Sequence, residues 1–191
     1  MENLQSIAKA FAKLLDIEYR MIIGRKGKTT EITLRFDASH FHHLAGFHKL
    51  TTLRIARARR AQVFEDVLRG EITCQDLEKS PDYKKISKRL ACLAHLEALL
   101  DSNRLVFRYD PKRAAHSLIL SDFLLVTPLN AEDIYVFISK DEEDTYFCRS
   151  FFPFAGKDYT KGQTKYTLLY KEKRNLRTGE AIVQFDKFSP R

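Results

Sequence analysis

Hydrophobic residues recur every three or four positions at the start of the chain, which is the spacing of a helix with one buried side. Asn3 is a residue type that caps helices, and Leu4, Ile7, Phe11 and Leu14 follow it on one face. This pattern predicts an amphipathic helix.

The pattern then changes to one that predicts a hairpin. Residues 19–23 are rich in apolar side chains, residues 24–28 hold two glycines among basic residues, and residues 30–36 alternate between apolar and polar positions. Asp37 or Ser39 is a capping residue type, and we expect a second helical region to begin there.

Two further helices are predicted before the middle of the chain. Residues 56–69 carry an apolar stripe, and Gly70 is suited to end that helix. The Ser-Pro-Asp triplet at 80–82 has a capping hydroxyl, a proline for the first turn and an acid for the positive end of the helix dipole. Helical spacing continues from there to about Asp101.

After Arg104 the period becomes that of strands, with many β-branched and aromatic residues. The predicted strands are 105–109, 117–126, 134–139, 146–152, 166–172 and a short last one at 181–185. The polar connection at 140–144 indicates an antiparallel pair. Helices first and strands later predict one α+β domain over residues 1–191, with N-terminal helices packed on a C-terminal antiparallel β-sheet.

Composition adds a positive charge to this picture. The 33 lysines and arginines exceed the 25 acids, for a net charge of +8, which favours a polyanionic partner such as nucleic acid. The three cysteines form no Cys-x-x-Cys pair, which argues against a disulfide framework or a zinc ribbon. With neither a secretory signal nor a run of ~20 apolar residues, we expect a cytoplasmic protein that does not enter membranes.

Histidines concentrate at one place in the chain. Four of the six lie at positions 40, 42, 43 and 48, directly before Lys49. A histidine beside a lysine can move a proton near neutral pH, while the lysine stabilises charge that develops on a phosphate. Of these histidines, His43 lies next to the apolar seam of the expected helix and is the first candidate.

Three other interpretations of the histidines stay open. They can bind a metal ion, although no carboxylate or thiolate beyond Asp37 lies at the usual ligand spacing. They can lie on a helix surface without a role, or one of them can be a buried, hydrogen-bonded structural residue.

A basic stretch follows the histidines. Residues 49–60 contain no acid and five cations, at Lys49, Arg54, Arg57, Arg59 and Arg60. A helix would align Arg54 and Arg57 into a stripe that can follow a phosphate backbone. The alternative is a solvated helix face.

Two of the late strands carry polar groups suited to phosphate chemistry. Period-two alternation puts Tyr146 and Ser150 on one face of their strand and Arg149 on the other. On the later strand, Tyr166 faces one way, and Thr167 and Lys171 face the other. The segment between these strands, residues 158–165, is polar and rich in hydrogen-bonding groups.

Four segments together resemble a known family, the barnase–EndoU–colicin–RelE-like (BECR-fold) nuclease domains associated with phages and mobile elements. These segments are residues 41–49, 146–152, 158–163 and 166–171. The resemblance spans the chain from the first hairpin to Lys173. It implies a fold of N-terminal helices against a four-stranded antiparallel sheet.

The resemblance also implies which residues act. The family's histidine-leucine-glycine motif falls on His43, Leu44 and Gly46, although His42 is a second candidate for the histidine. The late polar positions of the family fall on Arg149, Ser150 and Thr167. The implied site then has His43, Lys49, Arg149 and Thr167 as catalytic residues. Substrate contacts are expected from His42, Arg54, Arg57, Tyr146, Ser150, Tyr166 and Lys171.

The activity implied by the resemblance is a toxin-like endoribonuclease that needs neither a metal ion nor another cofactor. The ribose 2′-hydroxyl attacks the adjacent phosphate of a tRNA or an mRNA and leaves a 2′,3′-cyclic phosphate. An acidic antitoxin or immunity protein is the implied partner. The alternatives are a non-catalytic nucleic-acid-binding module and a phage-related protein-interaction domain.

Overall fold

The first helix of the structure begins and ends as its sequence pattern predicts. In this computed structural model, which describes residues 3–114 and 117–189, α1 spans Leu4–Leu14. The side-chain oxygen of Asn3 accepts a hydrogen bond from the Gln5 amide at 3.1 Å and so satisfies a donor that the first turn leaves unpaired.

The described helices are otherwise short and joined by tight turns. They are α2 (Ala38–Leu44), α3 (Arg60–Arg69), α4 (Cys74–Glu78), α5 (Lys84–Leu93) and α6 (Leu96–Ser102), with 3₁₀ turns η1 (Phe47–Lys49), η2 (Arg54–Arg57) and η3 (Pro111–Arg113). Gly70 ends α3 in the left-handed region, as predicted. None of these helices has the length and apolar character needed to cross a membrane.

The helix predicted from the Ser-Pro-Asp triplet differs from expectation. Ser80 is buried, and its hydroxyl bonds to Thr52 Oγ1 at 2.9 Å as well as accepting from the Asp82 amide, so the triplet forms a turn. The α-helix starts only at Lys84 and is divided into α5 and α6. The sequence between Leu93 and Leu96 has no glycine or proline that would mark this division.

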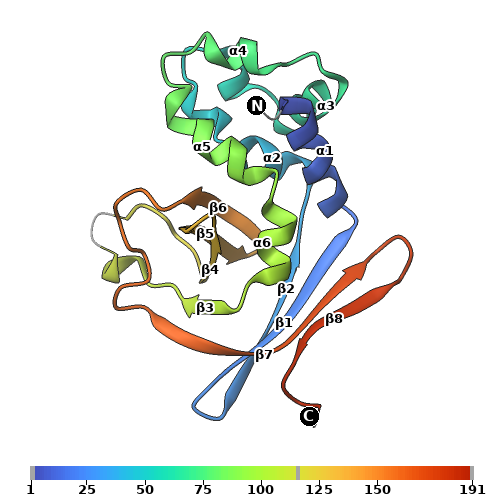
Figure 1. Ribbon diagram of the computed structural model, residues 1–191, viewed down its shortest axis with the longest axis vertical. Helices are drawn as coiled ribbons and strands as arrows, with labels where there is room; N and C mark the ends of the chain where they lie inside the picture. The colour runs from blue at the N-terminus through green and yellow to red at the C-terminus, as the bar shows by residue number, and fades with distance from the viewer. Residues whose placement is uncertain (1–2, 115–116, 190–191) are drawn as a thin grey trace. The chain divides into compact units, whose positions relative to one another are not determined.

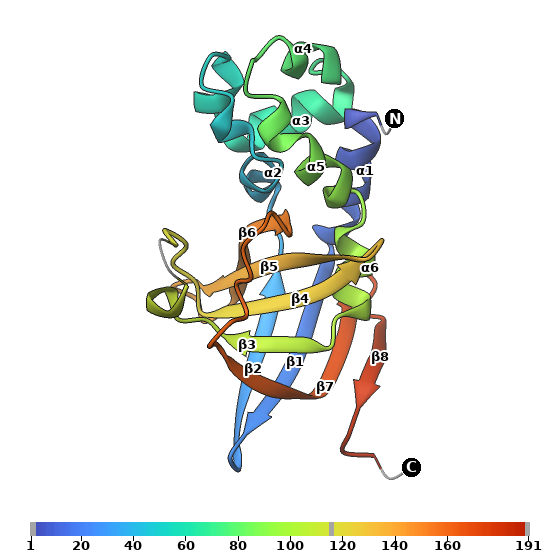
Figure 2. The same cartoon turned by 60° about the vertical axis from the view of Figure 1, so that its left-hand side comes forward.

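The strands form a closed barrel. They are β1 (Ile17–Arg25), β2 (Lys28–Arg35), β3 (Leu105–Arg108), β4 (Phe123–Leu129), β5 (Glu132–Lys140), β6 (Tyr146–Pro153), β7 (Thr164–Asn175) and β8 (Ala181–Asp186). Their order is β1-β2-β6-β5-β4-β3-β7-β8, and β1 also pairs with β7, which closes seven described strands into a ring (Figures 1 and 2). The eighth, β8, pairs with β7 alone.

This closure contradicts the predicted fold of helices packed on an antiparallel sheet. The N-terminal hairpin β1–β2 is a wall of the barrel rather than a separate element, and β2 meets β6 in parallel at the pair Leu34 and Tyr146. The sheet is therefore mixed. Alternation along the sequence predicts strands but does not specify which edges pair, and ring closure satisfies edges that an open sheet leaves free.

Contacts divide the chain into two compact units that interleave along the sequence. The helical unit consists of the described residues up to 15 and residues 37–98. The barrel unit consists of residues 16–36 and the described residues from 99 onward. The chain thus passes from one unit to the other three times.

Two bulges change the direction of side chains within the ring of seven described strands. In the β5–β6 pair, Cys148 lies opposite Ile138 and Ser150 opposite Phe137, so Arg149 is an extra residue in β6. In the β1–β7 pair, Leu169 is extra in the same way. Each bulge reverses the predicted alternation beyond it.

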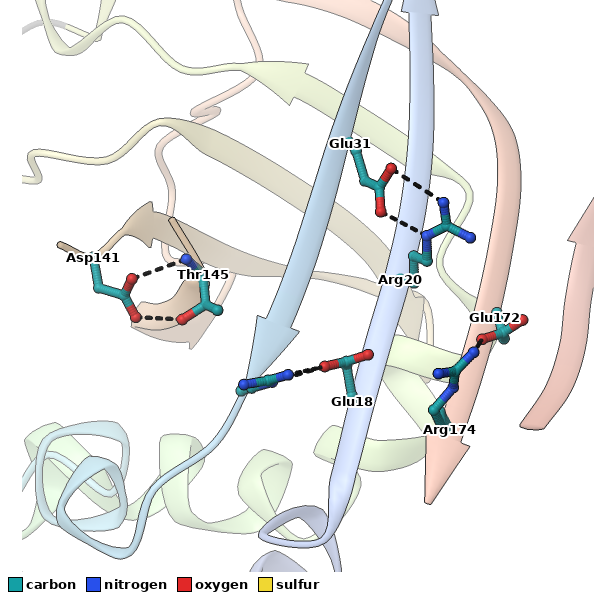
Figure 3. Close-up of polar contacts among 8 residues, drawn as sticks. Glu18, Arg20, Glu31, Asp141, Thr145, Glu172 and Arg174 are labelled. Carbon is teal, nitrogen blue, oxygen red and sulfur yellow. Dashed lines mark hydrogen bonds and ion pairs between the residues drawn. The ribbon is translucent and has the colours of Figure 1, made fainter. Parts of the chain in front are cut away.

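The outer face of β2, β1 and β7 carries paired charges (Figure 3). Arg20 binds Glu31 at 2.6 Å, Arg35 binds Glu18 at 2.6 Å, and Arg174 binds Glu172 at 2.9 Å. Figure 3 also shows Asp141 bound to Thr145 in the turn between β5 and β6. Each of these three arginines therefore has a carboxylate oxygen within 2.9 Å.

Candidate active site

The histidine segment is a short capped helix followed by a sharp turn. Asp37 caps α2 through the Ser39 amide, and the His40 ring accepts from the Asp37 amide, which completes a capping box. The helix ends at Leu44, earlier than expected, because Gly46 adopts a φ of 83° in the left-handed region. The 3₁₀ turn η1 then carries His48 and Lys49.

His42 is a buried structural residue. Its ring is 2% exposed, packs edge-on against Phe47, and donates from Nε2 to the carbonyl of Ile55 at 2.8 Å. Burial lowers the pKa of His42, and the cation of Arg60 lowers it further. The side chain therefore ties η2 to α2 as a neutral imidazole.

His43 and His48 stack face to face. Their ring centroids lie 4.5 Å apart with an angle of 13° between the planes, and both rings are partly exposed. Burial lowers the pKa of His48 to about 4, helped by the positive fields of His43, Arg89 and Lys49. His48 is thus neutral at physiological pH and stacks on the His43 ring without a charge of its own.

Cations surround the stacked pair. Burial lowers the pKa of Lys49, and the charges of Arg89 and Lys85 lower it further. Arg89, on α5, is only 6% exposed, and Lys85 lies one helical turn before it on the same face. Lys85 itself is ion-paired with Asp82 at 2.6 Å. Because neighbouring cations lower the pKa of Lys49, an anion bound beside Lys49 would stabilise its charged form.

Gly46 lets the histidine segment approach α5. A Cβ at this position would lie 2.9 Å from Ile86 Cγ2 and 3.3 Å from Arg89 Cδ. Because only glycine fits both this contact and the positive φ, Gly46 fixes Arg89 against the turn that bears His48 and Lys49.

The basic stretch after Lys49 is exposed and belongs to the same helical unit. Arg54 and Arg57 lie in η2, where residues three apart share a face, and Arg59 and Arg60 follow at the start of α3. The predicted stripe of Arg54 and Arg57 is therefore present, on a 3₁₀ turn rather than an α-helix.

The other predicted catalytic residues belong to the barrel unit. Arg149 is exposed at the bulge of β6, and Thr167 is exposed on β7. These strands are not neighbours in the ring, so Arg149 and Thr167 are not brought together by direct pairing.

The predicted tyrosines come together in the barrel. Tyr146 is 6% exposed, with its ring centroid 5.8 Å from that of Phe123, and Tyr166 lies 6.1 Å from the same ring. Ser150, predicted to share a face with Tyr146, lies beyond the Arg149 bulge and is partly exposed.

Lys171 does not share the face of Thr167, because the extra residue Leu169 turns it inward. It is 1% exposed, and its ammonium donates to the carbonyls of Leu100, Asp101 (2.9 Å) and Asn103 (3.3 Å) at the end of α6. Burial lowers the pKa of Lys171 to about 7. Lys171 caps a helix in the present structure.

The helical unit can therefore hold a phosphate and move a proton. It offers the stacked His43 and His48 for proton transfer and Lys49 and Arg89 for negative charge. Over residues 3–114 and 117–189, no three His, Cys, Asp or Glu side chains gather in a way that could hold a metal ion.

Sequence reasoning missed Arg89 and Lys85 as members of this cluster. The available signal was their spacing of four residues on one helix, beside a buried Ile86. Without the fold, nothing connects that face of α5 to the histidine segment.

Comparison with protein families gives one finding. Residues 3–187 match the family model described as phage-Barnase-EndoU-ColicinE5/D-RelE like nuclease4. Searches of curated proteins and of solved structures found no match.

Proposed function

The chain belongs to the family of phage-Barnase-EndoU-ColicinE5/D-RelE like nucleases, and from this membership we propose that it cleaves RNA without a metal ion. The family name indicates a nuclease in general. The observation that carries the finer proposal is the stacked pair His43 and His48 among the cations Lys49 and Arg89. Such a group can provide acid–base chemistry and charge stabilisation from side chains alone.

In the proposed reaction His43 acts on a proton. As general base it takes the proton of the ribose 2′-hydroxyl, and the 2′-oxygen then forms a bond to phosphorus. The bond to the 5′-oxygen breaks, and that oxygen takes a proton from solvent water and leaves as a 5′-hydroxyl, while protonated His43 returns its proton to the solvent. The products are a 2′,3′-cyclic phosphate and a free 5′ end. In the alternative assignment, protonated His43 gives its proton to the 5′-oxygen and solvent water accepts the proton of the 2′-hydroxyl, so the protons again balance.

Charge stabilisation is assigned to Lys49. The resemblance gives Arg149 the same role and gives Thr167 or Ser150 the role of orienting the substrate, and these roles of barrel-unit residues stay predictions. The depressed pKa of Lys49 supports its role, because an ammonium close to other cations gains most from a phosphate. Arg149 supports the proposal through its exposure at a bulge, where strands often present functional side chains.

Exposed Arg54 and Arg57 favour a second candidate function, a nucleic-acid-binding module that does not cut. They follow the phosphate backbone equally well in either case. An acidic antitoxin would bind the same exposed cations by charge complementarity.

The test is digestion of tRNA and mRNA in the presence of a chelator. We expect wild type to leave 2′,3′-cyclic phosphate ends, and His43→Ala to lower the rate by about 10²–10⁴-fold, the usual loss of a general base or acid. Lys49→Ala is expected to lower it as well. His95→Ala and Lys79→Ala are the matched controls, since both side chains are exposed and lie outside the cluster.

Three results would contradict the proposal. Full activity in His43→Ala removes the assigned proton transfer. Absence of cleavage with undiminished RNA binding favours the binding module. Activity that is lost with chelator and restored by a divalent cation favours a metal-dependent reaction.

A further inference from the structure

A cleft opens at the end of the barrel where β3 finishes and β7 begins. It has a volume of about 480 Å³, and its lining includes Arg108, Asp110, Arg113, Ser121, Gln163 and Thr164. This volume lies within the range of small-molecule sites. Gln163 and Thr164 of the polar segment 158–165 line this cleft, and the proposed reaction gives these two residues no role.

The rim of the cleft is held in a fixed shape by hydrogen bonds. The Asp110 amide donates to Gln163 Oε1 at 2.8 Å, and Gln163 Nε2 donates back to the Asp110 carbonyl at 3.0 Å. Arg113 Nη1 donates to the carbonyl of Gly162 at 2.7 Å. These bonds join η3 to the start of β7, so a ligand need not order the rim when it binds.

Two guanidinium groups at the cleft have only long ion pairs, although Arg113 also holds the Gly162 carbonyl through one of its nitrogens. Arg108 lies over the Phe123 ring at 5.0 Å and reaches Asp122 at 3.3 Å, and Arg113 reaches Asp110 at 3.4 Å. Both arginine side chains are at least half exposed. Pairs of this length and exposure contribute at most about 1 kcal/mol, whereas a phosphate accepts shorter, bidentate bonds from arginine.

We propose that this cleft binds one phosphodiester-linked nucleotide of a single-stranded nucleic acid, with Arg108 and Arg113 on the phosphate. The hydroxyl of Thr164 lies at the same cleft and contacts the sugar or base, whereas the Ser121 hydroxyl donates to the carbonyls of Phe123 and Ile138 and can only accept from a ligand. The identity of the strand as substrate rests on the proposed nuclease function. The contact itself is independent of His43 and Lys49.

Two acids pair with the arginines and determine which phosphate the cleft prefers. Asp110 is part of the cleft lining and pairs with Arg113, and Asp122 pairs with Arg108 outside that lining, so the four groups together carry no net charge. A phosphodiester has one negative charge and brings sugar and base contacts, whereas free phosphate is close to a dianion and brings neither. The cleft therefore favours a strand over inorganic phosphate.

The probe is a fluorescent 2′-O-methyl oligonucleotide of twelve nucleotides. It lacks the free 2′-hydroxyl that acts as the nucleophile, so the proposed reaction cannot cut it. We expect Arg108→Gln and Arg113→Gln each to weaken its binding by about 3–10-fold in fluorescence anisotropy. The double variant should lower the slope of log affinity against log salt by ~0.7, as for one lost phosphate contact on a single strand. Arg20→Gln, which alters an ion-paired arginine on the outer wall, is the matched control.

Several outcomes overturn this inference. One is a folded double variant that binds the probe as tightly as wild type does. Another is a wild-type protein that does not bind the probe at all. Competition by inorganic phosphate at the affinity of the strand shows a free-phosphate site instead. If one of the two single variants lowers the melting temperature, the other carries the test alone.

Failure of the proposed function gives a different result. If wild type does not cut unmodified RNA but the arginine variants still lose affinity for the probe, the cleft stands without the nuclease reaction. If wild type cuts RNA and the arginine variants retain both the KM for RNA and the affinity for the probe, the proposed binding to the cleft is wrong and the nuclease proposal stands.

Discussion

Two lysines show how similar side chains take different roles. Burial lowers the pKa of both Lys49 and Lys171. Lys171 directs its ammonium to three backbone carbonyls and is committed to the fold, whereas Lys49 lies close to the cations Arg89 and Lys85. The surroundings of each charge, rather than its burial, separate the structural residue from the candidate functional one.

Replacing Lys171 should therefore affect stability. Lys171→Met leaves buried carbonyls at the end of α6 without their donor, and we expect it to lower the free energy of unfolding by about 2–3 kcal/mol. Lys173→Met removes a partly exposed ion pair with Asp101 at 2.9 Å and should cost about 1 kcal/mol or less. Urea unfolding of the two variants measures the difference, and equal losses would argue against the helix-capping role.

The lowered pKa of His48 predicts a loss of stability in acid. Its pKa is about 4 in the folded chain and near 6.5 when unfolded, so the unfolded state binds the proton first. Stability is unaffected above about pH 6.5 and falls as the pH drops from there to about 4, by roughly 1–3 kcal/mol. The difference in unfolding free energy between wild type and His48→Gln isolates this contribution. Parallel pH curves would refute it.

The sequence predicts part of the candidate site. The histidines beside Lys49 predict a catalytic role for His43. The stretch without acids predicts substrate contacts for Arg54 and Arg57. Arg89 is not predicted, because α5 lies far along the chain and a single sequence does not show which helices pack together. The buried position of His42 is equally hidden, since its partner is the backbone carbonyl of Ile55 rather than a recognisable side chain.

At the scale of elements, one glycine joins a turn to a helix. Gly46 and Gly27 both have positive φ, at 83° and 75°, but a Cβ on Gly27 meets nothing within 4 Å. Gly27→Ala should cost ~1 kcal/mol for the left-handed conformation alone. Gly46→Ala should cost about 2–4 kcal/mol, because the new methyl also displaces Ile86 and Arg89.

The two alanine variants form a matched pair, since only one of them alters packing. Thermal unfolding measures the stabilities, and the cleavage assay measures whether α5 has moved away from His48 and Lys49. Equal destabilisation of the two would show that Gly46 makes no close contact with α5.

The local sequence pattern predicts most helices and strands, but it does not predict on which face of a strand each side chain lies. The strands from 105 onward occur close to the expected positions, except that 117–122 precede β4 rather than belong to it. The bulges at Arg149 and Leu169 reverse the faces beyond them. Neither position has a glycine or proline that would signal an extra residue, so a strict two-residue period placed Lys171 on the wrong side.

At the scale of the whole molecule, pairing between distant strands creates the barrel. Ile17 on β1 pairs with Asn175 on β7, and this contact turns an open sheet into a ring. Local hydrophobic pattern contains no information on such a pairing. The predicted α+β sheet was wrong for this reason, although most of its strands were correct.

The interleaved units predict that a simple truncation fails. A chain of residues 99–191 contains most of the barrel unit but lacks β1 and β2, which fill the ring between β7 and β6. We expect this fragment to show no cooperative unfolding by circular dichroism, while residues 1–191 unfold cooperatively. A sharp transition in the fragment would mean that the remaining strands close without the hairpin.

The late partner of β1 also has a consequence for synthesis on the ribosome. The hairpin emerges early, but its second neighbour appears only when residues up to 175 have been made. Domains generally fold from the N-terminus as they emerge, so one edge of β1 stays unpaired until β7 has been made. A nascent chain stalled before β7 would then be a preferred target for chaperones and proteases, and the cell would meet a complete barrel only in finished molecules.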